Sequence, residues 1–222
     1  MLSWHVEYNR AVSGTMPRMH FDAHQPVIDD LKAAGEFENT LIVFTSDNGG
    51  ESNRSGNVPF GPTCNLPLRA GKGWNYEGGI RIPTFITWPG KIPAMQTADP
   101  VITMDLYPTL LELTGCEQLP KQTVDGRSLV PLIRGEKKTL NRPFLAWWYP
   151  HANGHGTQPC QAILKDGWKL VHYIAQGETE LYRLDEDEGE RHDLVKAQPE
   201  KTRELLETLD RWVKETGHKQ SE

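Results

Sequence analysis

Two neighbouring oxygen-bearing side chains, Asp47 and Asn48, lie between an apolar run and a pair of glycines in the segment LIVFTSDNGG. A carboxylate and an amide oxygen together suit a hard divalent cation such as Ca²⁺ or Mg²⁺ better than they suit zinc. The two glycines allow the backbone to turn tightly after them. The same residue types also form ordinary turns. The pair by itself therefore leaves two interpretations open, a metal site and a strand-ending turn.

Lys72 is the second residue whose setting could support chemistry, because it lies between two glycines in the segment 70–73. A lysine on a Gly-flanked loop can reach an anionic group and stabilise negative charge that develops on a leaving oxygen. The loop lacks the G-x-x-x-x-G-K-[ST] spacing of a phosphate-binding P-loop. From the residues alone, a solvated loop lysine is the alternative interpretation.

Three further segments have both a functional and a structural interpretation. His151 and His155 in HANGHG could project toward a substrate, but a solvated Gly-rich loop is the favoured interpretation. The acidic run 185–193 lacks the ligand pattern of an EF-hand and its closing glutamate, and it predicts a solvated turn. The aromatic run 147–149 predicts packing in a small sheet rather than a platform for sugars.

The elements before the Asp-Asn pair are typical of an α/β fold. Residues 26–35 predict a helix that begins at Pro26, and the apolar run 41–46 predicts a strand buried on both faces within a parallel sheet. In such sheets ligands gather beyond the carboxyl ends of the strands. We therefore expect Asp47 and Asn48 to lie at a strand end that faces a ligand.

Further elements of the same domain follow the Lys72 loop. Residues 82–88 predict a second strand, and residues 126–135 predict a short helix. The segment 104–115 predicts a longer helix, which Asp105 would cap and Gly115 would end.

The last third of the chain predicts a small antiparallel sheet covered by a helix. The expected strands are short, aromatic and β-branched, and they lie at 143–150, 160–166, 168–174 and 179–185. Asp166-Gly167 is a hairpin signal between two of them. Residues 199–217 predict an amphipathic helix, whose apolar stripe consists of Leu205, Leu206, Leu209, Trp212 and Val213.

Composition restricts the class of protein and of partner. The chain has 222 residues, of which 37% are hydrophobic and 24% charged, as in ordinary globular proteins. The formal net charge of −6 and the mixing of acids with bases predict neither a nucleic-acid surface nor a polybasic membrane patch. The first ten residues predict no signal peptide, and the three cysteines leave the compartment unknown.

Several segments, in the same order along the chain, resemble the sulfatase family of the alkaline-phosphatase-like superfamily. They read T-S-D-N-G-G, N-L-P-L-R-A-G-K-G, Y-E-G-G-I-R-I-P and W-P-G, and the resemblance continues from about residue 37 to the C-terminus. It implies an α/β fold class: the remaining part of a sulfatase-type sandwich, plus a small C-terminal antiparallel sheet with a packed helix. The corresponding domains are a loosely ordered arm at 1–25, a partial large α/β domain at 26–140 and a small α+β domain at 141–222.

The resemblance also implies a reaction. Sulfatases hydrolyse sulfate esters with a formylglycine, made from the Cys or Ser of a C/S-x-P-x-R motif, and with Ca²⁺ or a similar divalent ion. Asp47 and Asn48 match two metal ligands of the family. Lys72 matches the lysine that contacts the sulfate and the leaving oxygen. The implied partner is an aryl or carbohydrate sulfate ester.

Some parts of the family pattern are absent from these 222 residues. No C/S-x-P-x-R motif occurs, because Pro67 and Arg69 follow Cys64 by three and five residues instead of two and four. We therefore predict no nucleophile in this chain, an incomplete Ca²⁺ or Mg²⁺ ligand set, and a truncated form, lacking an N-terminal half, with low or no activity by itself. Family members are usually periplasmic, secreted or lysosomal, whereas the first ten residues predict no signal peptide. The localisation therefore stays unknown.

Two other interpretations remain open from the sequence. One is a phosphatase or phosphodiesterase of the same superfamily, which would use a Thr or Ser nucleophile located upstream. The other is a non-catalytic binding protein derived from a sulfatase.

Overall fold

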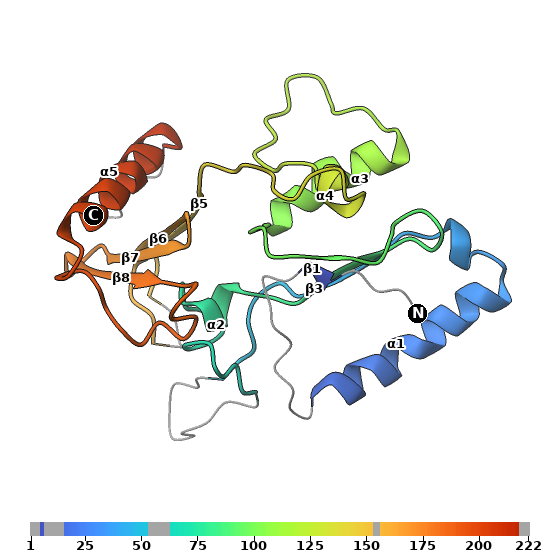
Figure 1. The fold of residues 1–222 in the computed structure, drawn as a ribbon, viewed down its shortest axis with the longest axis horizontal. Coiled ribbons are helices and arrows are strands. Elements are labelled where there is room, and N and C mark those ends of the chain that lie inside the picture. Colours follow the sequence, from blue (N-terminus) through green and yellow to red (C-terminus); the bar gives the residue numbers. More distant parts are fainter. Residues whose placement is uncertain (1–4, 7–15, 53–62, 153–155, 218–222) are drawn as a thin grey trace. The chain divides into compact units, whose positions relative to one another are not determined.

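The computed structural model describes residues 5–6, 16–52, 63–152 and 156–217 (Figure 1). The chain divides into two compact units, each made of two chain segments. The first unit combines 1–47 with 82–141, and the second combines 48–81 with 142–222. The sequence predicts domain boundaries after residues 25 and 140. It does not predict that residues 48–81 group with the C-terminal part. The predicted domain boundaries stay a prediction.

The first unit contains a mixed four-stranded sheet in the order β2-β3-β1-β4. The strands are β1 (His5–Val6), β2 (Ile42–Thr45), β3 (Thr84–Thr87) and β4 (Gln96–Thr97). Strands β2 and β3 form where the sequence predicts them. All four β2 residues are only half-buried, however, and β2 pairs with β3 in the antiparallel direction. The prediction of a doubly buried parallel strand is therefore wrong, because β2 is an edge strand within the described part of the sheet.

The helices of the first unit correct one boundary that the sequence predicts. They are α1 (Met16–Ala33), the 3₁₀ turns Phe37–Asn39 and Thr103–Asp105, α3 (Leu106–Thr114) and α4 (Val130–Ile133). Pro26 lies inside α1 and does not begin it. The helix starts ten residues earlier, where Pro17 occupies the first turn, a position in which the missing N–H group has no partner to lose.

Asp105 has a different role from the expected helix cap. Its Oδ2 accepts a hydrogen bond from the backbone N–H of Ile102 at 2.9 Å, and its Oδ1 accepts one from the backbone N–H of Arg127 at 2.8 Å. The buried carboxylate thus connects the turn before α3 to the segment before α4. Gly115 ends α3 in the left-handed conformation, with φ 68°, as predicted.

The second unit contains the predicted four-stranded antiparallel sheet. Its order is β5-β6-β7-β8, with β5 (Leu145–Tyr149), β6 (Cys160–Lys165), β7 (Trp168–Tyr173) and β8 (Glu178–Arg183). Asp166 and Gly167 form the tight turn between β6 and β7, and both have positive φ angles, of 51° and 75°. This is the backbone conformation that the Asp-Gly signal predicts.

Helix α5 (Pro199–Glu215) covers one face of this sheet, as predicted (Figure 1). Leu205 and Leu209 are fully buried against one apolar residue from each of β6, β7 and β8, namely Ile163, Leu170 and Leu181. Burying a leucine side chain stabilises a fold by roughly 1.5–3 kcal/mol, so these two residues account for much of the attachment of α5.

The opposite face of the sheet is covered by the loop 69–79, whose last residues belong to α2 (Glu77–Ile80). Because side chains alternate along a strand, the residues next to the α5-facing positions point to this face. They include Ala162, Val171 and Tyr182, and they pack with Tyr76 of the loop. Both faces of the sheet are therefore covered in this part of the chain.

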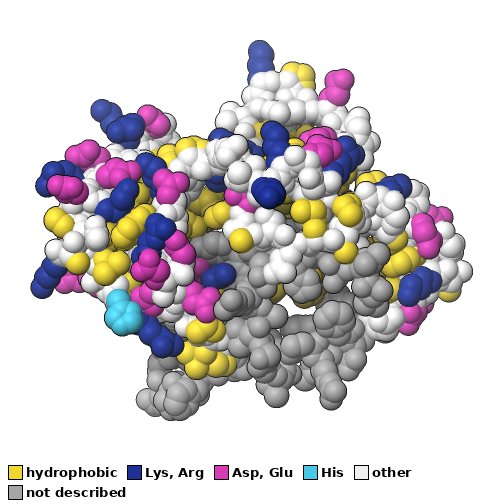
Figure 2. Space-filling model, viewed as in Figure 1, with side chains coloured by type: hydrophobic (Ala, Val, Ile, Leu, Met, Phe, Trp, Pro, Cys, Tyr) yellow, Lys and Arg dark blue, Asp and Glu magenta, His cyan; other side chains and the backbone are white. Residues whose placement is uncertain are grey.

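Surface charge is mixed on the face that Figure 2 shows, where lysines and arginines are interspersed with acidic side chains. Among the described residues, no helix combines the length and the hydropathy that crossing a membrane requires.

Candidate functional site

Backbone hydrogen bonds connect the segment after the Asp-Asn pair to the loop that carries Lys72. The N–H of Gly49 donates to the carbonyl of Gly79 at 2.8 Å. The N–H of Lys72 donates to the carbonyl of Gly50 at 3.1 Å. Asn48 and Lys72, which are 24 positions apart in the sequence, are therefore carried by two segments of the second unit that lie side by side.

The glycines in both segments are required by close backbone approach. A Cβ atom on Gly49 would lie 1.8 Å from the carbonyl oxygen of Gly78, and one on Gly79 would lie 2.1 Å from that of Trp74. Real Cβ atoms do not come this close to a carbonyl oxygen, so only glycine fits. The Gly-Gly pairs in the sequence thus mark where the two segments touch.

Asn65 stabilises this contact, although the sequence analysis did not select it. Its amide nitrogen lies 2.7 Å from the carbonyl oxygen of Gly50, 3.0 Å from that of Ala70 and 3.2 Å from that of Gly78. An amide has two N–H donors, so it can serve two of these acceptors well at any one time. In the sequence, Asn65 is distinguished only by its place at the start of the N-L-P-L-R segment, which resembles the family.

The residues predicted as site residues occupy different settings. Asp47 is exposed at the end of the first unit's segment, and Asn48, the first residue of the second unit, is half-buried. Lys72 is exposed on its loop. His151 is exposed, whereas His155 lies outside the described residues. The structure thus brings the segments of Asn48 and Lys72 together and leaves the predicted roles of all five residues as predictions.

The donor atoms of the Asp-Asn pair fit a hard cation in type but not in number. Such a cation takes about six oxygen ligands or more, and the pair can supply two side-chain groups. In the described part of the chain, no group of three or more His, Cys, Asp or Glu residues is arranged to hold a metal ion. The expected Ca²⁺ or Mg²⁺ stays a prediction with a partial ligand set.

Sequence reasoning missed a buried ionic cluster of one lysine and two glutamates. Lys169 Nζ lies 2.8 Å from Glu77 Oε1 and 2.8 Å from Glu190 Oε1, and the side chains of all three are shielded from water. Burial by itself would lower the pKa of Lys169, but the facing carboxylates of Glu190 and Glu77 outweigh this effect and raise it. The prediction that the run 185–193 is a solvated turn is wrong at Glu190, which is 2% exposed.

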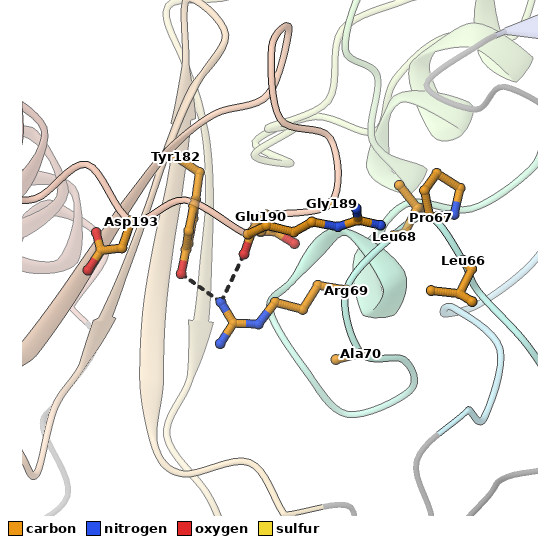
Figure 3. A pocket seen from close by; sticks show the side chains of 10 residues that line it. Leu66, Pro67, Leu68, Arg69, Ala70, Tyr182, Gly189, Glu190 and Asp193 are labelled. Carbon is orange, nitrogen blue, oxygen red and sulfur yellow. Dashed lines mark hydrogen bonds between the residues drawn. The ribbon is translucent and has the colours of Figure 1, made fainter.

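Arg69 attaches the other end of the loop to β8. Its Nη1 donates to the hydroxyl of Tyr182 at 2.6 Å and to the backbone carbonyl of Glu190 at 3.3 Å (Figure 3). The guanidinium carbon also lies 3.8 Å from the centre of the Tyr76 ring, a cation–π contact. The hydroxyl of Tyr76 in turn donates to Glu180 Oε2 at 2.6 Å. Burial and the hydrogen bond to Glu180 raise the pKa of Tyr76 far above its usual range, so it stays a neutral donor.

A pocket of about 600 Å³ opens beside Arg69, between the segment 66–70 and the residues 189–191 (Figure 3). Its lining mixes the apolar Leu66 with the charged Arg69 and Arg191. Neither Lys72 nor Asn48 lines it. This pocket is therefore separate from the residues that the sequence selects.

Comparison with family models supports the resemblance that the sequence predicts. The model described as "Sulfatase" matches residues 22–116. The model described as "N-sulphoglucosamine sulphohydrolase, C-terminal" matches residues 70–219, which is more than half of the chain.

Curated relatives are about one third identical to the chain over the aligned residues, which cover most of the chain. A protein named "Sulfatase" from Formosa agariphila is 35% identical over 195 residues, which cover 83% of the chain and 34% of the relative. "Steryl-sulfatase" of Mus musculus is 31% identical, with coverage of 82% and 33%. "Arylsulfatase A" of Homo sapiens is 31% identical, with coverage of 79% and 37%. The chain thus spans about a third of the length of these relatives.

Solved structures agree with the fold. The crystal structure of Ps i-CgsB matches with a TM-score of 0.71 at 30% identity, over 85% of this chain and 39% of that one. BT4656, solved in complex with D-glucosamine-2-N,6-O-disulfate, matches with a TM-score of 0.71 at 25% identity, over 87% of this chain and 38% of that one. These matches confirm the predicted fold class, a part of a sulfatase-type fold with a C-terminal antiparallel sheet and helix. The chain belongs to the sulfatase family.

Proposed function

We propose that this chain contributes part of the active site of a sulfuric ester hydrolase. In this proposal Asp47 and Asn48 supply two of the oxygen ligands of a divalent cation, and Lys72 contacts the sulfate group and the leaving oxygen. The observation that carries the proposal is the hydrogen bond from the Lys72 amide to the Gly50 carbonyl, at 3.1 Å. It holds the lysine loop against the residues that directly follow the Asp-Asn pair.

Each residue would have a specific task. The exposed ammonium group of Lys72 would stabilise the negative charge that develops on the leaving oxygen, and one such donor contributes about 3–4 kcal/mol in related electrostatic sites. A bound Ca²⁺ would supply Lewis-acid polarisation of the sulfate oxygens. The carboxylate of Asp47 and the amide oxygen of Asn48 would orient that ion, but they are two groups where about six oxygens are needed.

The names of similar proteins favour a sulfated carbohydrate as the substrate. One matching family model describes a sulphoglucosamine sulphohydrolase, and BT4656 binds a glucosamine disulfate. Ps i-CgsB has also been solved with k-i-k-neocarrahexaose. Aryl sulfates are the second candidate class, because "Arylsulfatase A" is among the relatives.

We further propose that the 222-residue chain has low or no activity by itself. It contains no C/S-x-P-x-R motif from which formylglycine could be made. Incubation of the purified chain with 4-nitrophenyl sulfate and CaCl₂ should therefore release no 4-nitrophenol. Hydrolysis that survives removal of contaminating sulfatases by a second purification would contradict this part of the proposal.

Calorimetric titration with CaCl₂ tests the metal ligands. We expect weak binding, with a dissociation constant on the order of 10⁻³ M, because the ligand set is partial. Asp47→Ala and Asn48→Ala should each abolish the heat of binding, whereas Asp125→Ala, a substitution of an exposed aspartate elsewhere, should not. Equal binding by all four proteins would show that the pair is only a turn.

A further inference from the structure

We propose that Lys169 is a positioning residue: through Glu77 and Glu190 it fixes the loop 69–79, and with it Lys72, in the orientation that meets an anionic substrate. This inference rests on the proposed role of Lys72. It assigns a function in catalysis to a residue on β7 that itself touches no substrate.

The cluster contains positive and negative groups in balance. Three ionisable side chains are removed from water here, one lysine and two glutamates. Arg81 Nη1 adds a second positive group, 3.9 Å from Glu77 Oε2. Removing charges from water opposes folding, so such a cluster is a weak source of stability. What it provides is a defined geometry, because each partner must stay in place to avoid an unpaired buried charge.

Glu77 connects the cluster to the loop through its backbone as well as its side chain. The backbone N–H of Glu77 donates to Glu190 Oε2 at 2.7 Å, so both the side chain and the backbone of Glu77 are held. The next residue, Gly78, donates its N–H to the carbonyl of Arg69 at 2.8 Å, which closes the base of the loop. Lys72 lies between these two ends. Fixing Glu77 therefore fixes one end of the short loop that carries Lys72.

The other end of the loop, at Arg69, has a contact of its own with the sheet. Arg69 donates to the Tyr182 hydroxyl at 2.6 Å, and this contact involves neither Lys169 nor its two glutamate partners. Only its longer hydrogen bond, to the Glu190 carbonyl at 3.3 Å, reaches a residue of the cluster. Loss of Lys169 should therefore loosen one end of the loop without detaching it from the sheet. The expected consequence is a change in the order of the loop rather than a loss of the fold.

Amide hydrogen exchange of the isolated 222-residue chain tests the proposal, because the two hydrogen bonds that join the loop to its neighbour are reporters. These are the amides of Lys72 and Gly49, which donate to Gly50 and Gly79. In Lys169→Met we expect the protection factor of the Lys72 amide to fall by at least about ten-fold, since local opening becomes easier.

Leu209→Ala is the matched control, because Leu209 is equally buried but lies on the α5 side of the same sheet. It should lower the melting temperature and leave the Lys72 and Gly49 amides protected. If Lys169→Met lowers the melting temperature and leaves both amides as protected as in the wild type, Lys169 is merely structural and the proposal is overturned.

A triple variant, Glu77→Gln with Lys169→Met and Glu190→Gln, keeps the test decisive if the single variant does not fold. It removes all three charges of the cluster together, while Arg81 keeps Glu188, whose Oε2 lies 3.7 Å from its Nη1. It still lacks the lysine that connects the two side chains. We expect a folded protein with reduced protection at Lys72, and wild-type protection would overturn the proposal. Because the exchange measurement involves no sulfate, its result does not depend on whether Lys72 binds an anion.

Discussion

Lys169 Nζ and Glu77 Oε1 are 2.8 Å apart, with both side chains completely shielded from water, although the residues are 92 positions apart in the sequence. This pair connects β7 to the loop that carries Lys72. It differs from the pair of Lys165 and Glu204, which is also close, at 2.6 Å, but reaches solvent on both sides. Both lysines belong to the same sheet, on β6 and β7, and the two pairs should respond differently to the loss of the lysine.

We expect Lys169→Met to reduce the free energy of unfolding by about 3–5 kcal/mol, because two buried carboxylates lose their counter-charge. Lys165→Met is the control and should cost at most about 1 kcal/mol, since an exposed pair is screened by water. Urea denaturation of both variants, followed by circular dichroism, gives the comparison. Equal losses would mean that the cluster is not held as described.

The close approach of the two glycine-containing segments predicts a second difference. A Cβ on Gly78 would lie 2.3 Å from the carbonyl oxygen of Arg69, whereas one on Gly177 would meet nothing within 4 Å. We expect Gly78→Ala to cost about 2–3 kcal/mol or more through overpacking. Gly177→Ala should cost about 1 kcal/mol, because the φ of Gly177 is +68° and alanine pays the left-handed penalty there. Thermal unfolding of the two variants measures the difference, and a reversed order would contradict the account.

His172 should make the stability of the second unit depend on pH. Burial lowers the pKa of His172 below its usual range, and Asp210 offsets only part of this effect. A folded-state pKa below the unfolded value of about 6.5 means that His172 contributes stability above pH 6.5 and loses it as the pH falls below. The melting temperature should therefore fall between about pH 7.5 and 5.5, and His172→Gln should flatten part of that slope. His192→Gln, at an exposed position, is the control, and an unchanged slope in His172→Gln would refute the assignment.

The three cysteines should differ in reactivity. Cys160 is buried, and burial raises the pKa of its thiol to about 11, so little of the nucleophilic thiolate is present or accessible. Cys64 and Cys116 are exposed. Iodoacetamide should modify two of the three thiols in the native chain and the third only after denaturation, which intact mass spectrometry can count. Rapid labelling of Cys160 in the native protein would show that this side of the sheet is open.

Local signals were sufficient to predict the second unit's sheet and its helix. Asp166-Gly167 favours a turn with two positive φ angles, so two residues predict the hairpin between β6 and β7. The spacing of Leu205 and Leu209 predicts a helix with one apolar face that packs on the sheet. The start of α1 and the exposure of β2 could not be obtained in this way. They depend on which strands and residues lie beside them, and the periodicity of a short apolar run does not contain that information.

Part of the candidate site was predictable and part was not. Asp47, Asn48 and Lys72 could be selected because their residue types and glycine neighbours allow only a few kinds of chemistry. Glu190 could not be selected, because it lies in an acidic run and its buried partner, Lys169, comes from a strand 21 positions earlier. Charge pairing across a fold depends on which faces become covered, and it becomes visible only when the chain is folded.

The measurement that tests the central claim most directly is a sulfate titration of the ¹⁵N-labelled chain in the presence of CaCl₂, monitored by backbone amide shifts. The account predicts saturable shifts at Lys72 and Gly73 that disappear in Lys72→Met and persist in Lys196→Met, a substitution of an exposed lysine elsewhere. Shifts caused by phosphate but not by sulfate would point to a phosphoryl-transfer enzyme of the same superfamily. Sulfate-induced shifts that are identical in the wild type and in Lys72→Met would contradict the account.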